Sequence, residues 1–384
     1  MKVLQLGKFY PIRGGVEKVM WDLTRGLSTH GVDCTMLCAT LPEDPVDPPD
    51  QGRCRETPEG REIRFNDYGR VICVPALAKK AATMLSPAMV RWLRRHAAEY
   101  DLIHVHHPDP MAALALRLSG YKGRVVLHWH SDILSQKFLL ALYRPLQRWL
   151  IRRADRILGT TPVYVRESPD LQGVQEKVGY VPIGIEPVIF EENAVRELRN
   201  RYKGRKIVVS LGRLVPYKGY STLIDAAALL DADYQVLIGG MGPLRESLQA
   251  QIDALGIQDR VQLLGYVPDE MVPTLFGACN VFVLSSVMKT EAFGIVQIEA
   301  MSCGRPVVAT KIPGSGTAWV NEDGTSGLNV EPEDAPALAD AIRQICDDEG
   351  RHKQYAEGAR KRFVTLFTFD KMIDRVLKEY ETLC

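Results

Sequence analysis

The stretch VFVLSSVMKTEAFGIVQIEAMSCG, residues 281–304, contains a strand, a loop and a helix in direct succession. Residues 281–284 form a short apolar run, which is typical of a strand buried on both faces. A helical pattern follows over residues 294–303, and Gly304 and Pro306 end it. A buried strand that leads into a helix is the unit from which parallel sheets are built, so this stretch predicts an α/β fold.

The same alternation continues toward both ends of the chain. We expect strands at residues 2–6, 33–38, 71–74, 102–106, 124–128, 156–159, 206–211, 234–238, 261–264, 281–284 and 307–309. Pro and Gly at 182–187 separate two halves, and 384 residues exceed one ordinary core. The prediction is two doubly wound, Rossmann-like α/β domains, 1–183 and 184–365, facing a cleft lined by strand carboxyl ends. The stretch 41–60 lacks periodicity and is interpreted as a loop insertion.

Composition favours a cytoplasmic protein. The eight cysteines are scattered without a C-x-x-C pair, so we expect reduced thiols and no zinc held by cysteine. The chain begins with a strand-like segment rather than a signal peptide. No apolar run reaches the roughly 20 residues that a membrane span needs.

The start of the helix at residue 294 predicts an anion site. The free N–H groups of Phe293, Gly294 and Ile295 and the positive end of the helix dipole favour a phosphate. Glu291 precedes this helix and Glu299 lies more than a turn inside it. We expect the two carboxylates to hold hydroxyl groups at opposite ends of one ligand, such as a sugar and a ribose.

Two cations follow the strand at 206–211. Arg213 and Lys218 flank the expected anion, and together they would neutralise a departing nucleoside diphosphate. No metal is required for this chemistry, and we expect no cofactor.

Gly14 and Gly15 lie between the first strand and the first helix, where backbone N–H groups meet ligands in doubly wound folds. The segment lacks the G-x-G-x-x-G fingerprint, which disfavours a nicotinamide cofactor. A plain tight turn is the alternative.

Together these motifs resemble those of the retaining glycosyltransferases of family 4. The resemblance rests on P-x-x-G-G-x-E at residues 11–17, P-x-G-I-E at 182–186, Arg213 with Lys218, and the E-x7-E spacing that ends at Glu299. It implies the GT-B fold, with the terminal helix 366–384 packing back on the first domain. It also implies that Glu291 contacts the 3- and 4-hydroxyls of the donor sugar, Glu299 the ribose, and the backbone at 265–267 the base.

The donor-binding residues expected from the motifs and the resemblance are Gly14, Gly15, Gly184, Arg213, Lys218, Val267, Glu291, Phe293, Gly294, Ile295 and Glu299. The loop at 314–319 departs from the Gly-Gly-x-x-Glu segment of many relatives, which leaves its role open.

Five histidines end two neighbouring strands: His104, His106, His107, His128 and His130. Zinc is conceivable there, but neither a cysteine nor H-E-x-x-H accompanies them, and strand alternation sends His104 and His106 one way and Ile103 and Val105 the other. We expect no metal. The resemblance implies that His130 faces the donor sugar, with His106, His107 and Asp132 as secondary candidates; the alternative is that these side chains cap strand ends.

The sequence lacks an evident pair of carboxylates for a covalent glycosyl intermediate. The resemblance instead implies front-face attack, in which the leaving diphosphate takes the acceptor proton. We therefore expect His130, Arg213, Lys218 and Glu291 to carry catalysis.

Residues 76–156 hold 14 Lys or Arg against 5 Asp or Glu, although the whole chain has a net charge of only +1. We define a basic face that would bind an anionic membrane surface or the acceptor. Its residues are Arg91, Trp92, Arg94, Arg95, Arg144, Arg148, Trp149 and Arg152. A solvated helix face is the alternative, and nucleic acid is disfavoured because no binding module accompanies the charge.

Segments 130–137 and 142–147 resemble the mannosyltransferases of O-antigen and capsule assembly. The expected reaction is transfer of mannose from GDP-mannose to a glycan or polyprenyl-diphosphate-linked acceptor at the inner face of the membrane. A sugar-nucleotide 2-epimerase of the same fold and a nucleotide-sugar-binding scaffold without turnover are the alternatives.

Overall fold

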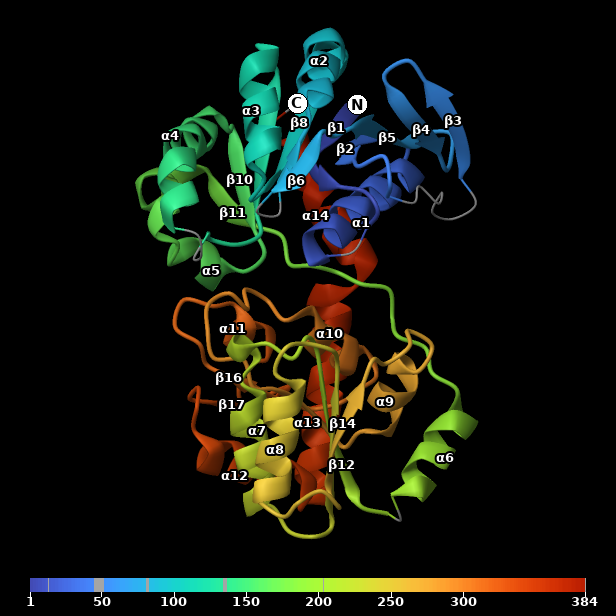
Figure 1. The fold of residues 1–384 in the computed structure, drawn as a ribbon, viewed down its shortest axis with the longest axis vertical. Helices are drawn as coiled ribbons and strands as arrows, with labels where there is room; N and C mark the ends of the chain where they lie inside the picture. The colour runs from blue at the N-terminus through green and yellow to red at the C-terminus, as the bar shows by residue number, and fades with distance from the viewer. Residues whose placement is uncertain (13, 45–51, 81–82, 134–136, 203, 384) are drawn as a thin grey trace. The chain divides into compact units, whose positions relative to one another are not determined.

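The computed structural model describes residues 1–12, 14–44, 52–80, 83–133, 137–202 and 204–383. The chain divides into two compact units (Figure 1). Unit 1 comprises Met1–Ile183 together with Met372–Cys384, and unit 2 comprises Gly184–Lys371. The terminal helix α14 (Phe369–Glu381) therefore begins in unit 2 and continues into unit 1.

Within its described residues, unit 1 contains a nine-stranded sheet in the order β11-β10-β9-β8-β1-β2-β5-β4-β3. Its strands are β1 (Lys2–Phe9), β2 (Asp33–Thr40), β3 (Arg53–Thr57), β4 (Gly60–Arg64), β5 (Gly69–Pro75), β8 (Leu102–His107), β9 (Arg124–Trp129), β10 (Arg156–Gly159) and β11 (Val178–Tyr180). All neighbours are parallel except the antiparallel pairs β3–β4 and β4–β5. A separate ribbon joins β6 (Ala78–Lys80) to β7 (Thr83–Leu85).

The loop predicted at 41–60 is partly wrong. Residues 53–57 form strand β3, which pairs with β4 at the edge of the sheet. All the side chains of β3 are exposed or half-buried, so the strand carries no alternation of apolar and polar residues. Residues 45–51 of the predicted loop lie outside the described part of the chain.

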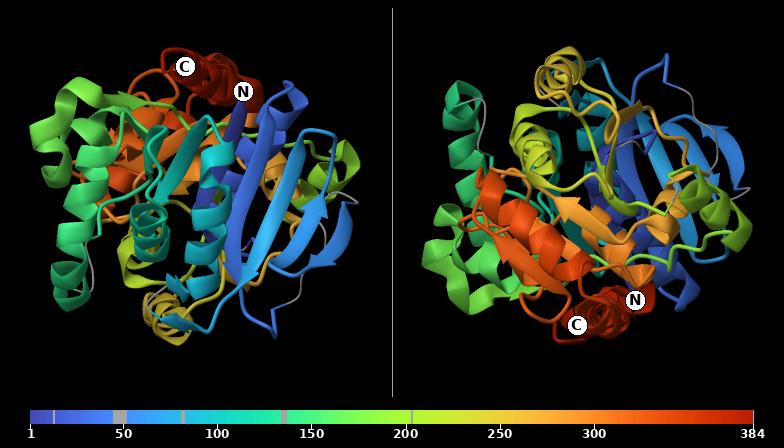
Figure 2. Two further views of the ribbon diagram at one scale, coloured as in Figure 1. Left: turned by 90° about the horizontal axis from the view of Figure 1, so that it is seen from above. Right: turned by 90° about the horizontal axis from the view of Figure 1, so that it is seen from below.

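Helices cover both faces of the unit 1 sheet. They are α1 (Gly15–Thr29), α2 (Pro87–His96), α3 (Pro110–Ser119), α4 (Lys137–Arg153), α5 (Pro162–Arg166) and most of α14, with short 3-10 segments at Ala97–Glu99 and Pro169–Lys177. Helix α1 packs on the face that includes Met36 and Cys73. The C-terminal half of α14 lies beside β1 on the same face, where Tyr380 contacts Gln5 (Figure 2). Helices α2, α3 and α4 pack in sequence on the opposite face.

The described residues of unit 2 form a parallel six-stranded sheet in the order β14-β13-β12-β15-β16-β17. Its strands are β12 (Lys206–Leu211), β13 (Tyr234–Gly239), β14 (Val261–Gly265), β15 (Val281–Leu284), β16 (Val307–Thr310) and β17 (Gly327–Val330). Its helices are α6 (Glu192–Arg201), α7 (Tyr220–Leu229), α8 (Arg245–Ala254), α9 (Val272–Ala278), α10 (Ile295–Ser302), α11 (Thr317–Val320), α12 (Ala335–Cys346) and α13 (Glu349–Arg362), followed by a π-helical turn at Phe363–Phe367.

Helices α7, α8 and α12 lie on one side of unit 2 (Figure 1), and their buried side chains form one core with those of the strands. Strands β13 and β15 are buried along their whole length, and β15 is a continuous apolar run, as expected for a parallel strand covered on both faces. The carboxyl ends of β12, β13 and β14 are therefore brought to one edge of the sheet.

Among the described residues, no helix is both long and apolar enough to cross a membrane.

Candidate functional site

Unit 2 contains a pocket of ≈ 560 Å³. The lining residues are Val188, Leu211, Gly212, Arg213, Gly239, Gly240, Met241, Tyr266, Val267, Asp269, Val272, Pro273, Phe276, Val296 and Glu299. Most of them follow the carboxyl ends of β12, β13 and β14 or belong to α9 and α10. The volume lies within the range of small-molecule sites, and the mostly apolar wall carries three charged side chains, those of Arg213, Asp269 and Glu299.

A glycine allows two strand ends to meet at this pocket. Gly240 follows β13 with a φ of +147°, and a Cβ there would lie 1.8 Å from the carbonyl oxygen of Gly212. Any other residue would push the two loops apart and change the shape of the pocket wall.

Arg213 and Lys218 are both found at the pocket. Arg213 lines it with an exposed side chain. Lys218 lies next to the lining residue Gly212, since a Cβ on Gly212 would be 3.3 Å from the Lys218 Nζ. The two cations therefore sit at the same end of β12, where a diphosphate could contact both.

Lys218 already has a partner. Its Nζ lies 2.5 Å from Oε2 of Glu291, and both side chains are only 12 % exposed. The Ser286 hydroxyl donates to the same carboxylate oxygen at 3.1 Å. The structure thus joins two residues that the sequence analysis placed at one site, and a bound anion would compete with Glu291 for Lys218.

The loop at 314–319 supports the Glu291 segment. The Ser315 hydroxyl donates to the main-chain oxygen of Glu291, and the Gly316 N–H donates to that of Ala292 at 3.0 Å. These contacts give the loop a structural role that its sequence alone did not reveal.

Helix α10 begins as predicted. Gly294 is its N-cap with a φ of +75°, and a Cβ there would lie 2.7 Å from Leu284 Cδ2 and 2.8 Å from Gln297 Nε2. Phe293 is buried against Phe367, with ring centroids 5.9 Å apart, while Ile295 is half-buried. Glu299 lines the pocket from within this helix. The pocket thus adjoins the first turns of α10, whose leading N–H groups have no partner within the helix.

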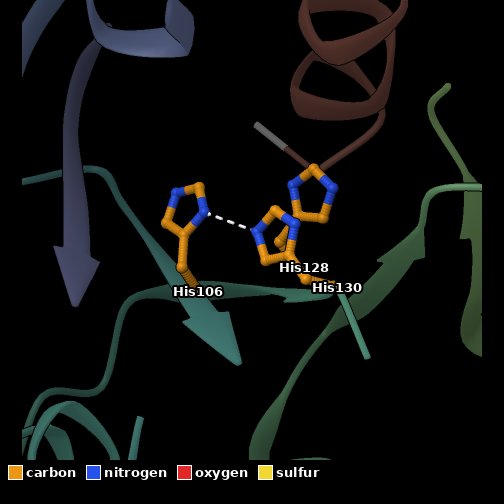
Figure 3. A group of neighbouring side chains, drawn as sticks. All are labelled: His106, His128 and His130. Carbon is orange, nitrogen blue, oxygen red and sulfur yellow. Dashed lines mark hydrogen bonds between the residues drawn. The ribbon is translucent and has the colours of Figure 1, made fainter. Parts of the chain in front are cut away.

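A second cluster lies in unit 1. His104 and His106 on β8, His128 on β9 and His130 just after β9 lie with their rings stacked on the same face of the sheet, and we name them the histidine stack. Neighbouring rings are nearly parallel, with the closest centroids, those of His128 and His130, 4.1 Å apart. His106 Nδ1 lies 2.9 Å from His130 Nε2 (Figure 3).

Burial lowers the pKa of every histidine in the stack, because the charged form would lose its hydration. The pKa of His128 falls to about 3, and both of its ring nitrogens are buried with no hydrogen-bond partner among the described residues. For His130, the charges of neighbouring histidines and Lys8 lower the pKa further. The stack is therefore neutral at pH 7.

The two secondary candidates next to the stack have other contacts. His107 points to the opposite face, where its ring stacks on Trp129 at 3.8 Å and its Nε2 lies 3.3 Å from Gln147. Asp132 accepts hydrogen bonds from Trp129 Nε1 at 2.9 Å and from the Ser168 hydroxyl at 2.7 Å. Both residues therefore hold the end of β9 in place.

His106, His128 and His130 offer nitrogen atoms that all lie within 4.8 Å of one another. Neutral imidazoles are suitable zinc ligands, but ligands in a tetrahedral site with bonds of about 2.0 Å lie roughly 3.3 Å apart. A metal ion there would have to replace the hydrogen bond between His106 and His130. The geometry as it stands fits that hydrogen bond better than a metal.

The remaining donor residues expected from sequence are divided between the units. Gly14 is the N-cap of α1 and Gly15 its first residue, and the Glu17 carboxylate folds back against Gly14. Gly184 is the first residue of unit 2.

The assignment of Trp92 to the basic face is wrong. Trp92 is 7 % exposed and packs against His96 and Tyr100, because it lies on the side of α2 that faces the core. Arg95 on this helix pairs with Glu59 at 2.6 Å. Trp149 is half-buried, with Arg117 over its ring. The exposed members are Arg91, Arg94, Arg95, Arg144, Arg148 and Arg152.

Comparison with known proteins agrees with this architecture. Residues 13–188 match the family model described as Glycosyltransferase Family 4, and residues 191–362 match that described as Glycosyl transferases group 1. The O-antigen chain mannosyltransferase C of Escherichia coli is 31 % identical over 386 residues, covering 100 % of this chain and 99 % of the relative. The chain belongs to glycosyltransferase family 4. The resemblance inferred from the motifs is confirmed.

Other similar proteins agree. The D-rhamnosyltransferase WbpZ of Pseudomonas aeruginosa is 32 % identical over 373 residues, covering 96 % of this glycosyltransferase and 92 % of WbpZ. The crystal structure of Anabaena HepE in complex with UDP has a TM-score of 0.78 at 22 % identity, with all of both chains covered. The fold of the glycosyltransferase is GT-B, as predicted.

The sequence analysis did not identify several residues of the unit 2 pocket and of the histidine cluster in unit 1. Asp269 could have been found, since it follows β14 at the same sheet edge as Arg213. Tyr380 gave no signal, because it lies 276 residues from His104, to whose Nδ1 its hydroxyl is hydrogen-bonded.

Proposed function

We propose that this glycosyltransferase moves mannose from GDP-mannose to a glycan or polyprenyl-diphosphate-linked acceptor, with retention of configuration and without a metal ion. Similarity to a mannosyltransferase supports the sugar, as does similarity to a D-rhamnosyltransferase, because D-rhamnose is 6-deoxymannose. The O-antigen relative supports a role in cell-surface polysaccharide synthesis at the inner face of the membrane.

The unit 2 pocket carries the proposal. Arg213 and Lys218 at the end of β12 would contact the diphosphate together with the start of α10, and Glu299 in the pocket wall would accept ribose hydroxyls. A base would lie against the apolar residues Met241 and Val267.

Asp269 supports guanine as the base. Asp269 lines the pocket and follows Val267 by two residues. Guanine presents two adjacent donors, N1–H and the N2 amino group, which one carboxylate can accept together. Uracil presents a single N–H flanked by two carbonyl oxygens, which would face the same carboxylate with like partial charge.

The pair Lys218–Glu291 supplies a mechanism for engaging the donor. A bound diphosphate would draw Lys218 away from Glu291, which frees the carboxylate to accept the 3- and 4-hydroxyls of the sugar. The leaving phosphate then takes the proton of the acceptor hydroxyl in front-face attack, while Arg213 and Lys218 stabilise the developing charge. Losing one such preorganised donor costs roughly 3 kcal/mol in the transition state.

His130 in unit 1 is the proposed contributor on the sugar side. Its ring is neutral at pH 7 because burial lowers its pKa, so it acts through a hydrogen bond rather than a full charge. The exposed arginines of the basic face would hold an anionic membrane near the acceptor.

A panel of GDP-, UDP- and ADP-sugars offered to the purified protein tests the proposal. We expect transfer or slow hydrolysis with GDP-mannose, and looser GDP binding in Asp269→Asn while UDP binding is unchanged. Interconversion of donor epimers without acceptor would indicate the epimerase. Donor binding without turnover, equal in wild type and His130→Ala, would indicate the scaffold. No binding, hydrolysis or transfer with any donor would refute the whole proposal.

A further inference from the structure

We propose that Tyr380, Gln5 and His106 are positioning residues that fix which nitrogen of His130 carries its proton. This inference rests on the proposed function, since it takes His130 as the group that meets the substrate. All of the contacts involved lie within unit 1.

The side chains form one continuous line of hydrogen bonds. The Tyr380 hydroxyl of α14 accepts from Gln5 Nε2 at 3.1 Å and is also hydrogen-bonded to His104 Nδ1. Gln5 Oε1 lies 2.8 Å from His106 Nε2. His106 Nδ1 in turn lies 2.9 Å from His130 Nε2.

The amide of Gln5 gives this line a direction. Because its NH2 group points to Tyr380, its oxygen points to His106 and can only accept. His106 therefore carries its proton on Nε2 and has a lone pair on Nδ1. His130 must then donate from Nε2 to that lone pair.

The consequence for His130 is a defined tautomer. Its Nε2 is engaged with His106, and its Nδ1 is left with a lone pair that can accept a hydrogen bond from a substrate hydroxyl. If the Gln5 amide were reversed, every proton in the line would shift and Nδ1 would become a donor instead. Gln5 thus selects the chemical character of the nitrogen that His130 presents.

Burial keeps the arrangement intact. Gln5, His104, His106 and Tyr380 are each 0 % exposed, so water cannot compete for their hydrogen bonds. The groups whose charges act on His130 are His104, His106 and His128 of the stack and Lys8 from β1, and all of them disfavour its protonation. The tautomers rather than the charges of these rings are therefore set by Gln5 and Tyr380.

Histidine tautomers can be read directly by NMR after selective 15N labelling, because the shifts of Nδ1 and Nε2 show which nitrogen is protonated. The signal of His130 is assigned by its loss in His130→Ala. We expect the Nε2–H form in the wild type and a mixture of tautomers in Gln5→Leu and Tyr380→Phe. An Nδ1–H form in the wild type, or no change in either variant, would overturn the inference.

Kinetics separate positioning from mere support of the fold. We expect Tyr380→Phe to lower kcat about tenfold, the rate equivalent of one hydrogen bond, with KM for GDP-mannose unchanged. The matched control is Tyr143→Phe, which removes from the same unit a buried hydroxyl that has no partner in the described part of the chain and should leave kcat unaltered. An equal loss of kcat in Tyr380→Phe and Tyr143→Phe would indicate a general packing effect and would refute the positioning role of Tyr380.

A third variant tests the line of hydrogen bonds by introducing a negative charge into it. Gln5→Glu places a carboxylate against His106, which favours a protonated ring and raises the pKa of the His106–His130 pair. We expect the acidic limb of the plot of kcat against pH to shift to higher pH by about one unit or more. An unshifted plot would contradict the proposed line of hydrogen bonds. If His130→Ala itself retains full activity, the proposed role of His130 fails; if it is inactive while Tyr380→Phe is normal, only the positioning fails.

Discussion

The histidine stack and His107 should together make unit 1 sensitive to mild acid. Five histidines at the ends of β8 and β9 are buried and neutral, with the pKa lowered by burial in each case and to about 3 for His107 and His128. In the unfolded chain each has a pKa of about 6.5. Between these values the unfolded state binds more protons, so stability is lost as pH falls below about 6.5 and is constant above it.

The size of the effect follows from the number of buried rings. At pH 5.5 each histidine that is protonated only on unfolding costs about 1.4 kcal/mol relative to neutral pH. Five such rings cost about 7 kcal/mol, which is comparable with the total stability of a typical domain, 5–15 kcal/mol. Unit 1 should therefore open near pH 5.5 or somewhat below.

Unit 2 serves as an internal control, because it contains a single histidine, His352. Hydrogen exchange followed by mass spectrometry reads the two sheets separately. We expect peptides from β8 and β9 to lose protection between pH 7.5 and 5.5, while peptides from β12 and β13 keep theirs. Equal protection of β8 and β9 at both pH values would refute the reasoning.

A single substitution tests how much each buried histidine contributes to the loss of stability in acid. His128→Leu removes a ring whose two nitrogens have no partner, so it should cost little at neutral pH and reduce the loss at pH 5.5 by about 1.4 kcal/mol. An unchanged pH dependence in this variant would show that other groups are responsible.

The remaining predictions concern the donor site and the basic face. Lys218→Ala should lower kcat/KM for the donor about 100-fold, and a loss of less than threefold in steady-state assays would contradict its role at the diphosphate. Glu299→Gln should raise KM roughly tenfold with kcat retained, as one charge-assisted hydrogen bond is weakened. Gly294→Ala should destabilise unit 2 by about 1–3 kcal/mol in urea unfolding, because φ is +75° and a Cβ would meet a strand side chain at 2.7 Å. Charge reversal of Arg148 and Arg152 should abolish co-sedimentation with anionic liposomes and leave neutral liposomes unaffected; equal binding by wild type and variant would remove the membrane proposal.

Local sequence determined most of the architecture, since parallel strands covered on both faces must be continuous apolar runs. The run at β15 and the glycine before α10 locate the strand, the loop and the helix start without any tertiary information. The carboxyl-end rule for parallel sheets then places Arg213 and Glu299 at one edge. By contrast, β3 escaped prediction because an edge strand without buried residues has no pattern to read.

Only the tertiary structure decided which side chains meet. Nothing in the spacing of Lys218 and Glu291 shows that they pair, because the contact depends on how the loops after two separate strands fold. The inward orientation of Trp92 depends on which side of α2 faces the core. The line from Tyr380 to His130 requires a helix from the end of the chain to pack on its first strand, and contacts over such separations leave no trace in local sequence.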